Sequence, residues 1–193
     1  MIRLVSDRPT PPASESARAS ALGYTVTAME QPEGAAGRAL VVVVDDRRAR
    51  GVAEDHSGPL VTELLHEAGF VVDGVVVVSA DEVEIRNALN TAVIGGVDLV
   101  VSVGGTGVSP RDVAPEATMA LLDRELPGIA EALRASGLAA GSSDAGLSRG
   151  LAGISGSTLV VNLAGSRAAV RDGMATLCPL AVSVIAELSS LEI

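Results

Sequence analysis

Short apolar runs of strand length, separated by stretches with helical spacing, constrain the fold of this chain more than any other feature. Valine and leucine fill most of residues 40–44, 71–78, 99–103 and 158–163. Residues 40–44 form an unbroken run, which is typical of a strand covered on both faces, as in a parallel sheet, whereas Asp73 and Gly74 interrupt the run over residues 71–78. The alternation of these runs with helices predicts an α/β fold with a doubly wound, mostly parallel sheet.

The first two helices have recognisable ends in the sequence. After a loop over residues 47–56, Ser57 is predicted to be the N-cap of a helix that closes at Gly69. Asp81 and Glu84 stand at the spacing of a capping box, which predicts the start of the next helix.

Prolines divide the second half of the chain. Pro115 is predicted to open a helix that Pro127 breaks, and Pro179 is predicted to break the last helix. Between them, residues 151–154 and 158–163 are predicted to be two strands around a tight turn.

Residues 1–37 differ in composition from the rest of the chain. They are rich in proline and serine and have few apolar side chains to bury. We therefore predict a flexible N-terminal arm, which could contact a partner protein, with one short strand over residues 24–27. Residues 38–193 are predicted to be the folded domain.

The charged residues exclude several kinds of function. All 14 basic residues are arginine, so the chain has neither the lysine of a Walker-type phosphate loop nor one for Schiff-base chemistry. The net charge of -10 argues against nucleic-acid binding. Cys178 is the only cysteine, which excludes a disulfide framework and a thiolate metal cluster. With no signal peptide and no apolar run of membrane-spanning length, we expect a cytoplasmic protein that does not bind membranes.

Four segments should meet at one edge of the predicted sheet, because ligands of α/β folds bind beyond the carboxyl ends of parallel strands. These segments are residues 45–46, 79–81, 104–112 and 165–166. The turn Gly104-Gly105-Thr106-Gly107 follows a strand and precedes a helix, so its N–H groups could cradle a phosphate. The same turn could also be only a tight connection.

Charged residues close to this turn could complete a phosphate site. Arg111 could neutralise phosphate, and Asp112 could hold Mg²⁺ together with phosphate oxygens and water. Asp81 could act catalytically or be an ordinary N-cap. Asn162 to Ser166 form a second loop of small residues, which could bind a polar ring or another phosphate at the N-terminus of the last helix.

The stretch over residues 104–118, GGTGVSPRDVAPEAT, resembles the pattern GGTG-x-x-x-RD-x-TPEAT of the Mog/MoaB-like family of molybdenum cofactor biosynthesis proteins. Residues 55–58, 123–134, 147–149 and 158–166 also fit the family, so the resemblance covers about residues 39–188. It implies a three-layer α/β fold, the molybdopterin-binding fold, assembled as a homotrimer or hexamer.

The resemblance also implies an activity. Enzymes of the family bind molybdopterin and transfer AMP to its phosphate from Mg-ATP. Carried over by position, Asp81 and Asp112 would be catalytic, with Asp112 also binding Mg²⁺. The residues that would bind molybdopterin or nucleotide are Gly104, Gly105, Thr106, Gly107, Ser109, Arg111, Asn162, Gly165 and Ser166.

Two departures from the family pattern keep other functions open. Ala114 replaces a threonine that would cap the following helix, and Ala164 replaces a proline in the second loop. Loss of the cap should cost about 0.5–2 kcal/mol of stability. The alternatives are a family member that binds or regulates another protein without adenylylation, as gephyrin does in scaffolding, and a pterin-binding enzyme of different chemistry.

Overall fold

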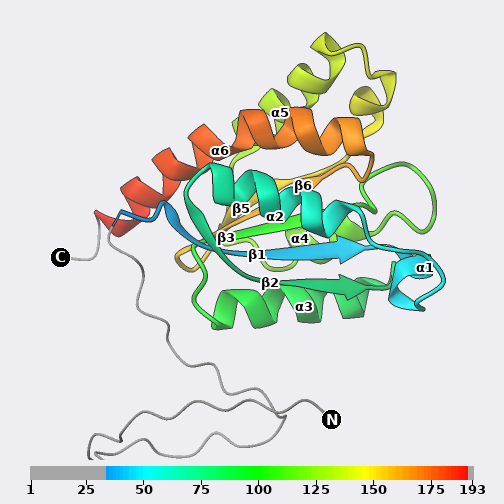
Figure 1. Ribbon diagram of the computed structural model, residues 1–193, viewed down its shortest axis with the longest axis horizontal. Coiled ribbons are helices and arrows are strands. Elements are labelled where there is room, and N and C mark those ends of the chain that lie inside the picture. The colour runs from blue at the N-terminus through cyan, green and yellow to red at the C-terminus, as the bar shows by residue number, and fades with distance from the viewer. Residues whose placement is uncertain (1–33, 191–193) are drawn as a thin grey trace, which may run out of the picture.

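The computed structural model describes residues 34–190 as one mixed sheet flanked by helices (Figure 1). The predicted three-layer α/β architecture is confirmed. The elements, in chain order, are β1 (Gly37–Val44), α1 (Asp46–Ala49), α2 (Ser57–Glu67), β2 (Phe70–Val78), α3 (Glu82–Ile94), β3 (Leu99–Val103), α4 (Ala114–Met119), β4 (Arg124–Glu125), α5 (Pro127–Ala139), the 3-10 helix η1 (Ser143–Leu147), β5 (Ala152–Ser155), β6 (Thr158–Leu163) and α6 (Arg167–Ser189).

The sheet has the strand order β2-β1-β3-β6-β5-β4. The first four strands are parallel, whereas β5 and β4 are antiparallel to their neighbours. The chain places β2 on one side of β1 and then crosses to place β3 on the other side. The strand order therefore reverses between β1 and β3, which is the position where open α/β sheets bind ligands.

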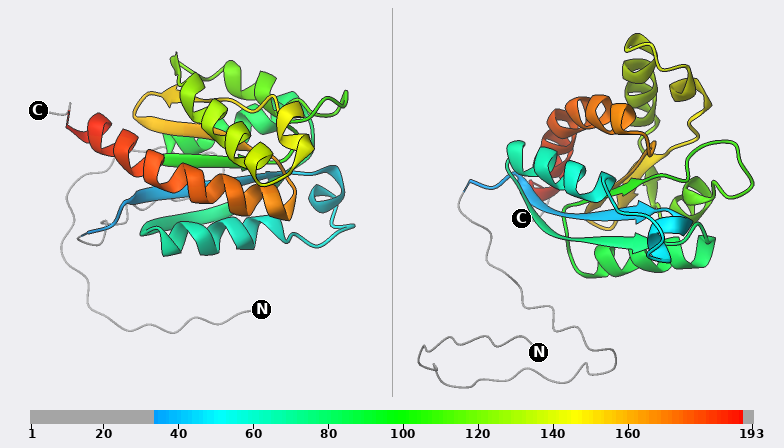
Figure 2. Two further views of the ribbon diagram at one scale, coloured as in Figure 1. Left: turned by 90° about the horizontal axis from the view of Figure 1, so that it is seen from above. Right: turned by 45° about the vertical axis from the view of Figure 1, so that its right-hand side comes forward.

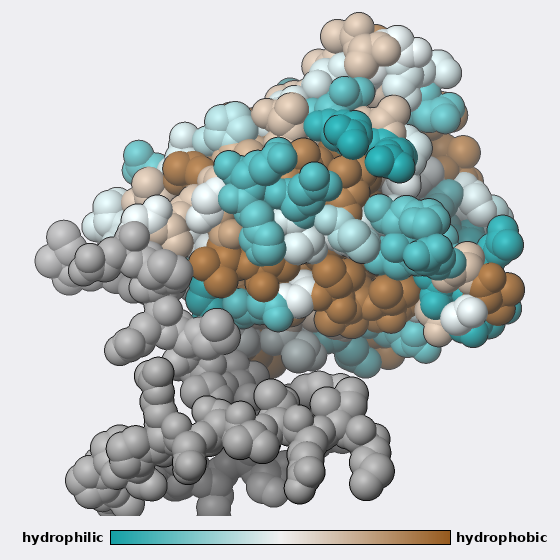
Figure 3. All heavy atoms as spheres, viewed as in Figure 1, coloured by the Kyte–Doolittle hydropathy of each residue, from teal (hydrophilic) through white to brown (hydrophobic). Residues whose placement is uncertain are grey.

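Helices cover both faces of the sheet, as Figures 1 and 2 show. On the face drawn in Figure 3, hydrophobic residues lie in patches among hydrophilic ones. The helices α2, α5 and α6 pack on one face, and α3 and α4 pack on the other. Along β1, Val41 and Val43 belong to the first core, while Val42 and Val44 belong to the second. Because each strand residue is buried on one face or the other, the strand reads as an unbroken apolar run rather than an alternating one.

Two segments of the chain differ from the predicted secondary structure. Residues 46–49, predicted as part of a loop, form the short helix α1, because the Asp45 carboxylate accepts hydrogen bonds from the N–H groups of Arg47 (2.8 Å) and Arg48 (2.9 Å). The helix that begins near Pro115 ends at Met119 rather than at Pro127. The chain then forms the edge strand β4, whose pairing with β5 no local pattern in the sequence indicates.

The last helix is continuous through Pro179, so the predicted break there is wrong. The proline removes only the hydrogen bond to the carbonyl of Ala175. Ala175 is exposed, so water can satisfy that carbonyl. Ser57 lies inside α2 and is buried, and the N-cap position belongs to His56.

The helix α6 is long and apolar enough to cross a membrane by length and composition alone, contrary to the sequence-based expectation. In the fold it lies along the sheet, with Val170, Met174, Leu177 and Ala181 buried in the first core. It is therefore a helix that covers the sheet. The predicted arm and the predicted strand over residues 24–27 lie outside the described residues.

Candidate active site

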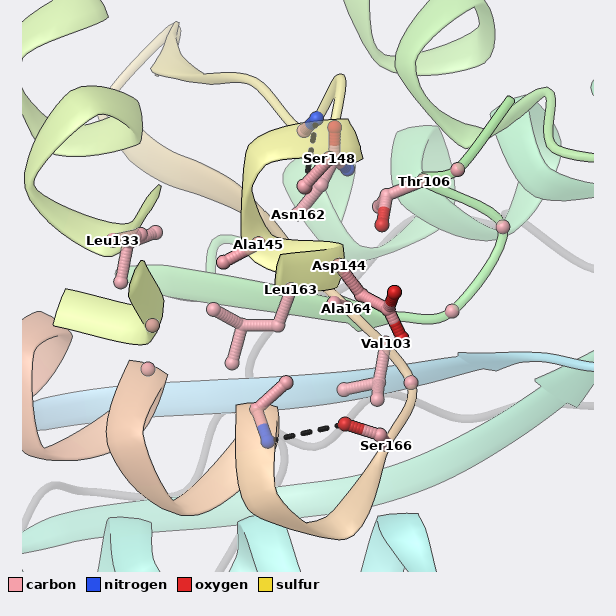
Figure 4. Close-up of a pocket in the computed structure, with 18 of the residues that line it drawn as sticks. Val103, Thr106, Leu133, Asp144, Ala145, Ser148, Asn162, Leu163, Ala164 and Ser166 are labelled. Atoms are coloured by element: carbon pink, nitrogen blue, oxygen red, sulfur yellow. Dashed lines mark hydrogen bonds between the residues drawn. The ribbon is translucent and has the colours of Figure 1, made fainter. Parts of the chain in front are cut away.

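A cavity of about 550 Å³ opens at the carboxyl ends of β1, β3 and β6. This is the edge predicted from the topology, at the point where the strand order reverses. Its volume is within the range of small-molecule sites, about 300–1,000 Å³. Figure 4 shows residues of its wall, with Thr106, Ser148 and Asn162 on one side of the view and Ser166 on the other. Of the predicted site residues, the wall includes Gly104, Gly105, Thr106, Gly107, Asp112, Asn162, Gly165 and Ser166.

The turn over residues 104–107 has the backbone of an anion cradle. Gly104 and Gly105 have φ angles of 100° and 65°, which favour glycine. The Gly104 N–H donates to the Leu163 carbonyl (2.9 Å), and the Gly105 carbonyl accepts from the Ala114 N–H (3.0 Å). Within residues 34–190, the N–H groups of Gly105, Thr106 and Gly107 make no hydrogen bond with the protein. They are available to a ligand.

The two loops predicted to bind ligand pack against each other. A Cβ atom at Gly104 would lie 2.5 Å from the Val44 carbonyl oxygen, and one at Gly165 would lie 3.2 Å from the Gly104 Cα. Contacts this close exclude side chains at Gly104 and leave little room at Gly165. Glycine therefore brings the ends of β1, β3 and β6 together at the cavity.

Asp112 closes the loop that follows the glycine turn. Its Oδ2 atom accepts a hydrogen bond from the Ser109 N–H (2.9 Å), and its own N–H donates to the Ser109 carbonyl (2.9 Å). These two bonds fix the carboxylate in the cavity wall. Ser109 itself is exposed and contributes to this loop rather than to the wall.

Ser166 is the N-cap of α6, and its hydroxyl accepts a hydrogen bond from the Ala169 N–H (3.2 Å; dashed in Figure 4). The hydroxyl accepts there and keeps its own hydrogen to donate to a ligand. This end of α6 also offers a ligand its remaining N–H groups and the positive end of the dipole of a 23-residue helix.

Asn162 lies in the cavity wall, but its amide is bonded within the protein. Nδ2 donates to the hydroxyls of Ser102 (2.6 Å) and Thr118 (2.8 Å), and Oδ1 accepts from the Leu151 N–H (3.1 Å). Both amide hydrogens are used. Asn162 therefore ties together β3, β6, α4 and the start of β5, and its predicted contact with ligand stays a prediction.

Asp81 and Arg111 are not part of the cavity wall. The Asp81 carboxylate caps α3 by accepting from the N–H groups of Val83 (3.0 Å) and Glu84 (3.1 Å), as its N-cap interpretation predicts. Arg111 pairs with the Asp46 carboxylate, at 2.7 Å between Nη2 and Oδ1. Hydrogen bonding to Arg111 lowers the pKa of Asp46, and the same bond raises the pKa of Arg111. A catalytic role for Asp81 and a phosphate contact of Arg111 stay predictions.

The charged groups of the cavity wall are mostly acidic. Four carboxylates line it, and only two guanidinium groups. Arg48 is held by Ser57 and by the carboxylates of Asp45 and Asp55. Arg134, which the sequence analysis did not single out, donates to the Gly150 carbonyl (3.1 Å) and forms no ion pair within the described part of the chain. The lining charged residues are Asp45, Arg48, Asp112, Arg134, Asp144 and Asp172.

Arg149, also absent from the predicted site, lies behind the glycine turn. Its N–H donates to the Thr106 carbonyl (2.8 Å), and its guanidinium donates to the carbonyls of Gly107 and Asp112 and pairs with Glu116. The partners lie 33 to 43 residues earlier in the chain, so no local spacing reveals them.

The two departures from the family pattern have small local effects. Val113, not Ala114, is the N-cap of α4, and Ala114 is fully buried in the second core. The predicted loss of a cap at Ala114 is therefore wrong, because the position is a packing position. Ala164 lines the cavity beside Gly165 and is partly exposed.

Comparison with known proteins identifies the family. Residues 40–182 match the family described as a probable molybdopterin binding domain. The molybdenum cofactor biosynthesis bifunctional protein of Chlorobaculum tepidum is 36% identical over 142 residues, which are 74% of this chain and 45% of that protein. The chain thus spans less than half the length of this relative. The molybdopterin adenylyltransferase of Helicobacter pylori is 34% identical over 147 residues, with 72% of this chain and 80% of that protein covered.

Solved structures agree with this assignment. A molybdopterin biosynthesis protein from Mycobacterium abscessus is 77% identical and superposes with a TM-score of 0.80, covering 82% of this chain and 99% of that one. The sheet, the glycine turn and the matched residues lead to one conclusion: the chain belongs to the molybdopterin-binding domain family of molybdenum cofactor biosynthesis proteins, which includes the Mog and MoaB proteins.

Proposed function

We propose that the protein adenylylates molybdopterin at the expense of Mg-ATP. One phosphate oxygen of molybdopterin forms a bond to the α-phosphorus of ATP, the bond from that phosphorus to the bridging oxygen breaks, and pyrophosphate leaves. The observation that carries the proposal is the turn of Gly105, Thr106 and Gly107, whose N–H groups are unpaired within the described residues at the rim of a 550 Å³ cavity. The name of the Helicobacter pylori relative supports the same reaction.

A second candidate anion position lies at the N-terminus of α6, where Gly165 packs beside Gly104 of the turn. The N-terminus of α6 is directed to the cavity through Gly165 and Ser166. The reaction brings together two phosphorylated substrates, and the cavity supplies two sets of backbone donors on separate elements. Arg134 adds a guanidinium group without a carboxylate partner in the described chain, which suits contact with a phosphate.

The charge of the wall supports a need for Mg²⁺. Four carboxylates against two guanidinium groups would repel two polyanions. Among residues 34–190, no group of three or more metal-ligating side chains is present to hold a metal alone. Mg²⁺ usually takes one or two carboxylates together with substrate phosphates and water, and Asp112 provides one such carboxylate. When bound, the ion would offset the charge of the phosphates.

The protein's own residues therefore bind and orient rather than react covalently. Backbone N–H groups hold phosphate oxygens, and Asp112 holds the ion that accompanies them. Such a transfer is accelerated mainly in two ways. The site aligns the two reactants, and its fixed hydrogen-bond donors stabilise the charge that develops in the transition state. We expect the reaction to take place in the cytoplasm, where ATP is made available to biosynthetic enzymes.

We also propose that the chain forms a homotrimer or hexamer. An apolar groove of about 380 Å³ lies between α6 and the β4–β5 edge. Only 33% of the most apolar 18-residue stretch of α6 is buried within the chain. A second copy of the chain seated in the groove would cover both the groove and the exposed apolar side chains of α6. Light scattering at several concentrations checks this assembly, and Val184→Arg, in the groove wall, should weaken it.

Release of pyrophosphate tests the proposed function. Purified protein with molybdopterin, ATP and Mg²⁺ should release pyrophosphate and form an adenylylated pterin in equal amounts. Omission of molybdopterin separates transfer from ATP hydrolysis, and EDTA should stop both products. Binding of molybdopterin without pyrophosphate release would overturn adenylylation and favour a binding or regulatory protein.

A further inference from the structure

Arg149 joins three parts of the site without touching the cavity. It lies between η1 and β5, and the cavity wall contains its neighbours Ser148 and Gly150 but not Arg149 itself. Its N–H donates to the Thr106 carbonyl (2.8 Å), and its Nε donates to the Gly107 carbonyl (2.7 Å). Nη2 also donates to the Asp112 carbonyl.

Glu116 holds the guanidinium group from the other side. This residue is in the first turn of α4, and both of its carboxylate oxygens face the two terminal nitrogens of Arg149. The hydrogen bond from Arg149 lowers the pKa of Glu116, and the same bond raises the pKa of Arg149, with a further contribution from the charge of Asp112. The pair therefore stays ionised at neutral pH.

The contacts at the Thr106 and Gly107 carbonyls determine where the N–H groups of Gly107 and Val108 point, at the end of the glycine turn. In a trans peptide, the carbonyl of one residue and the N–H of the next lie in one plane and point in opposite directions. The bond from Arg149 to the Thr106 carbonyl therefore directs the Gly107 N–H away from Arg149. The bond to the Gly107 carbonyl directs the Val108 N–H in the same way.

Glycine alone would leave these directions free. Gly107 has no Cβ atom, so the peptide planes on either side of it can rotate at little cost. A Cβ atom there would lie 2.8 Å from Oδ2 of Asp112, so a larger residue could supply rigidity only by displacing that carboxylate. The constraint must come from another segment, and Arg149 is the residue that makes contact at each of the three carbonyls.

We propose that Arg149 is a positioning residue whose side chain fixes the peptide between Gly107 and Val108, so that the Val108 N–H is aimed at the bound phosphate, and holds the Asp112 loop at a fixed distance from the glycine turn. The phosphate in this inference rests on the proposed function, whereas the rigidity of the turn does not. Glu116 orients the Arg149 guanidinium, so its loss should loosen the turn and the Asp112 loop less than loss of Arg149 itself.

Four variants test this role. Arg149→Met keeps the length of the side chain and removes its guanidinium donors to the Gly107 and Asp112 carbonyls, while the backbone bond to Thr106 remains. Arg149→Lys keeps the charge but cannot reach several acceptors at once. Glu116→Gln removes the anion that orients the guanidinium. Arg38→Met is the matched control, because Arg38 clamps the Asp73 carboxylate and the Gly96 carbonyl at the opposite end of the sheet.

The first measurement is hydrogen exchange of the ligand-free protein. Amide exchange at Ser109, Arg111 and Asp112, whose N–H groups are hydrogen-bonded within the loop after the turn, should become faster in Arg149→Met than in the wild type, and it should stay unchanged in Arg38→Met. This measurement requires no ligand and no turnover. Unchanged exchange in Arg149→Met would overturn the inference whatever the activity of the protein.

The second measurement is calorimetric binding of Mg-ATP, with inorganic pyrophosphate as a simpler probe. Arg149→Met should bind Mg-ATP about tenfold to a hundredfold more weakly, as expected when hydrogen bonds to a charged ligand are lost. Arg149→Lys should not restore the affinity, and Arg38→Met should bind as the wild type does. In turnover, KM for ATP should rise together with a fall in kcat, because the misaimed donors serve both the substrate and the leaving group.

The two proposals fail in different ways. If the wild type binds neither Mg-ATP nor pyrophosphate, the proposed function is overturned, and hydrogen exchange still decides the role of Arg149. If the wild type binds Mg-ATP and Arg149→Met binds it equally well, the positioning role is overturned while adenylylation stands. A loss of affinity in Arg38→Met equal to that in Arg149→Met would show a general effect of stability and would also overturn the positioning role.

Discussion

The guanidinium group of Arg111 forms a forked ion pair with the carboxylate of Asp46, with Nε 3.1 Å from Oδ2 and Nη2 2.7 Å from Oδ1. Asp46 begins α1 and also accepts a hydrogen bond from the Ala80 N–H (3.0 Å). The pair thus joins the loop after the glycine turn to the ends of β1 and β2, beside the cavity rather than within it.

This pair should be detectable by titration. Its hydrogen bonds lower the pKa of Asp46 below the usual 3.8. A lowered carboxyl pKa contributes stability that is present above pH 3.8 and is lost as the pH falls through the lowered value. NMR titration of the Asp46 carboxyl should show the depressed midpoint, and Arg111→Met should return it towards 3.8. A midpoint that does not move in the variant would contradict the pairing.

Asp112→Asn should separate the metal-binding role of Asp112 from its structural role. The amide oxygen of asparagine can still accept from the Ser109 N–H, so the loop keeps its form, while the charge is lost. We expect kcat for pyrophosphate release to fall about a hundredfold to a thousandfold, as for loss of one group that stabilises transition-state charge. The melting temperature should change little. Normal turnover by Asp112→Asn would show that Asp112 does not bind the metal ion.

Gly104→Ala should destabilise the fold. The residue has φ 100°, and the added Cβ atom would lie 2.5 Å from the Val44 carbonyl oxygen. We expect the free energy of unfolding to fall by about 1–3 kcal/mol, measured by urea denaturation. Gly156→Ala is the control, since its φ is 59° and no atom lies within 4 Å of the added group. An equal loss of stability in both variants would show that the positive φ, and not the contact with the Val44 carbonyl, causes the effect.

Asn162→Ala should reduce stability more than a change at the cavity surface would. It would leave the buried hydroxyls of Ser102 and Thr118 and the Leu151 N–H without their partner. Buried polar groups without partners cost about 1–3 kcal/mol each, so we expect a loss of at least that size in the free energy of unfolding. Thermal and urea denaturation would measure it. A variant as stable as the wild type, with weaker ligand binding, would instead favour direct contact with ligand.

Cys178 should react slowly with alkylating agents in the folded protein. Burial of this thiol raises its pKa above the usual 9.0, so less than half of it is thiolate at pH 9. Iodoacetamide should modify the thiol much more slowly at that pH than it modifies the urea-unfolded chain. Equal rates would show that the thiol is exposed in solution.

The parallel half of the sheet was predictable because burial on both faces leaves a mark in the sequence itself. The five residues of β3 are all buried, and four of them are apolar. The antiparallel half was less predictable. The strand β4 has two residues, both exposed charged side chains, and its place depends on pairing with β5 some thirty residues later. Pro179 misled because a proline on an exposed helix face removes one bond without ending the helix.

Within the site, the sequence indicated the glycine turn and Asp112 because their residue types and spacing are local. It could not show that Arg111 is paired with Asp46, 65 residues away, or that Arg149 supports the turn. Asn162 illustrates the same limit. Its residue type suits a ligand contact, but the structure surrounds its amide with Ser102, Thr118 and Leu151. Partners from distant segments decide whether a polar side chain is free to act.

The acidic lining of the cavity has a consequence for how the protein would respond to its surroundings. Because Asp45, Asp112, Asp144 and Asp172 outnumber the two lining arginines, uncomplexed ATP should be a poor competitor of its magnesium complex. Occupancy would then follow the supply of free magnesium rather than the total nucleotide pool. A cell short of the ion would slow this step even while its ATP remained abundant.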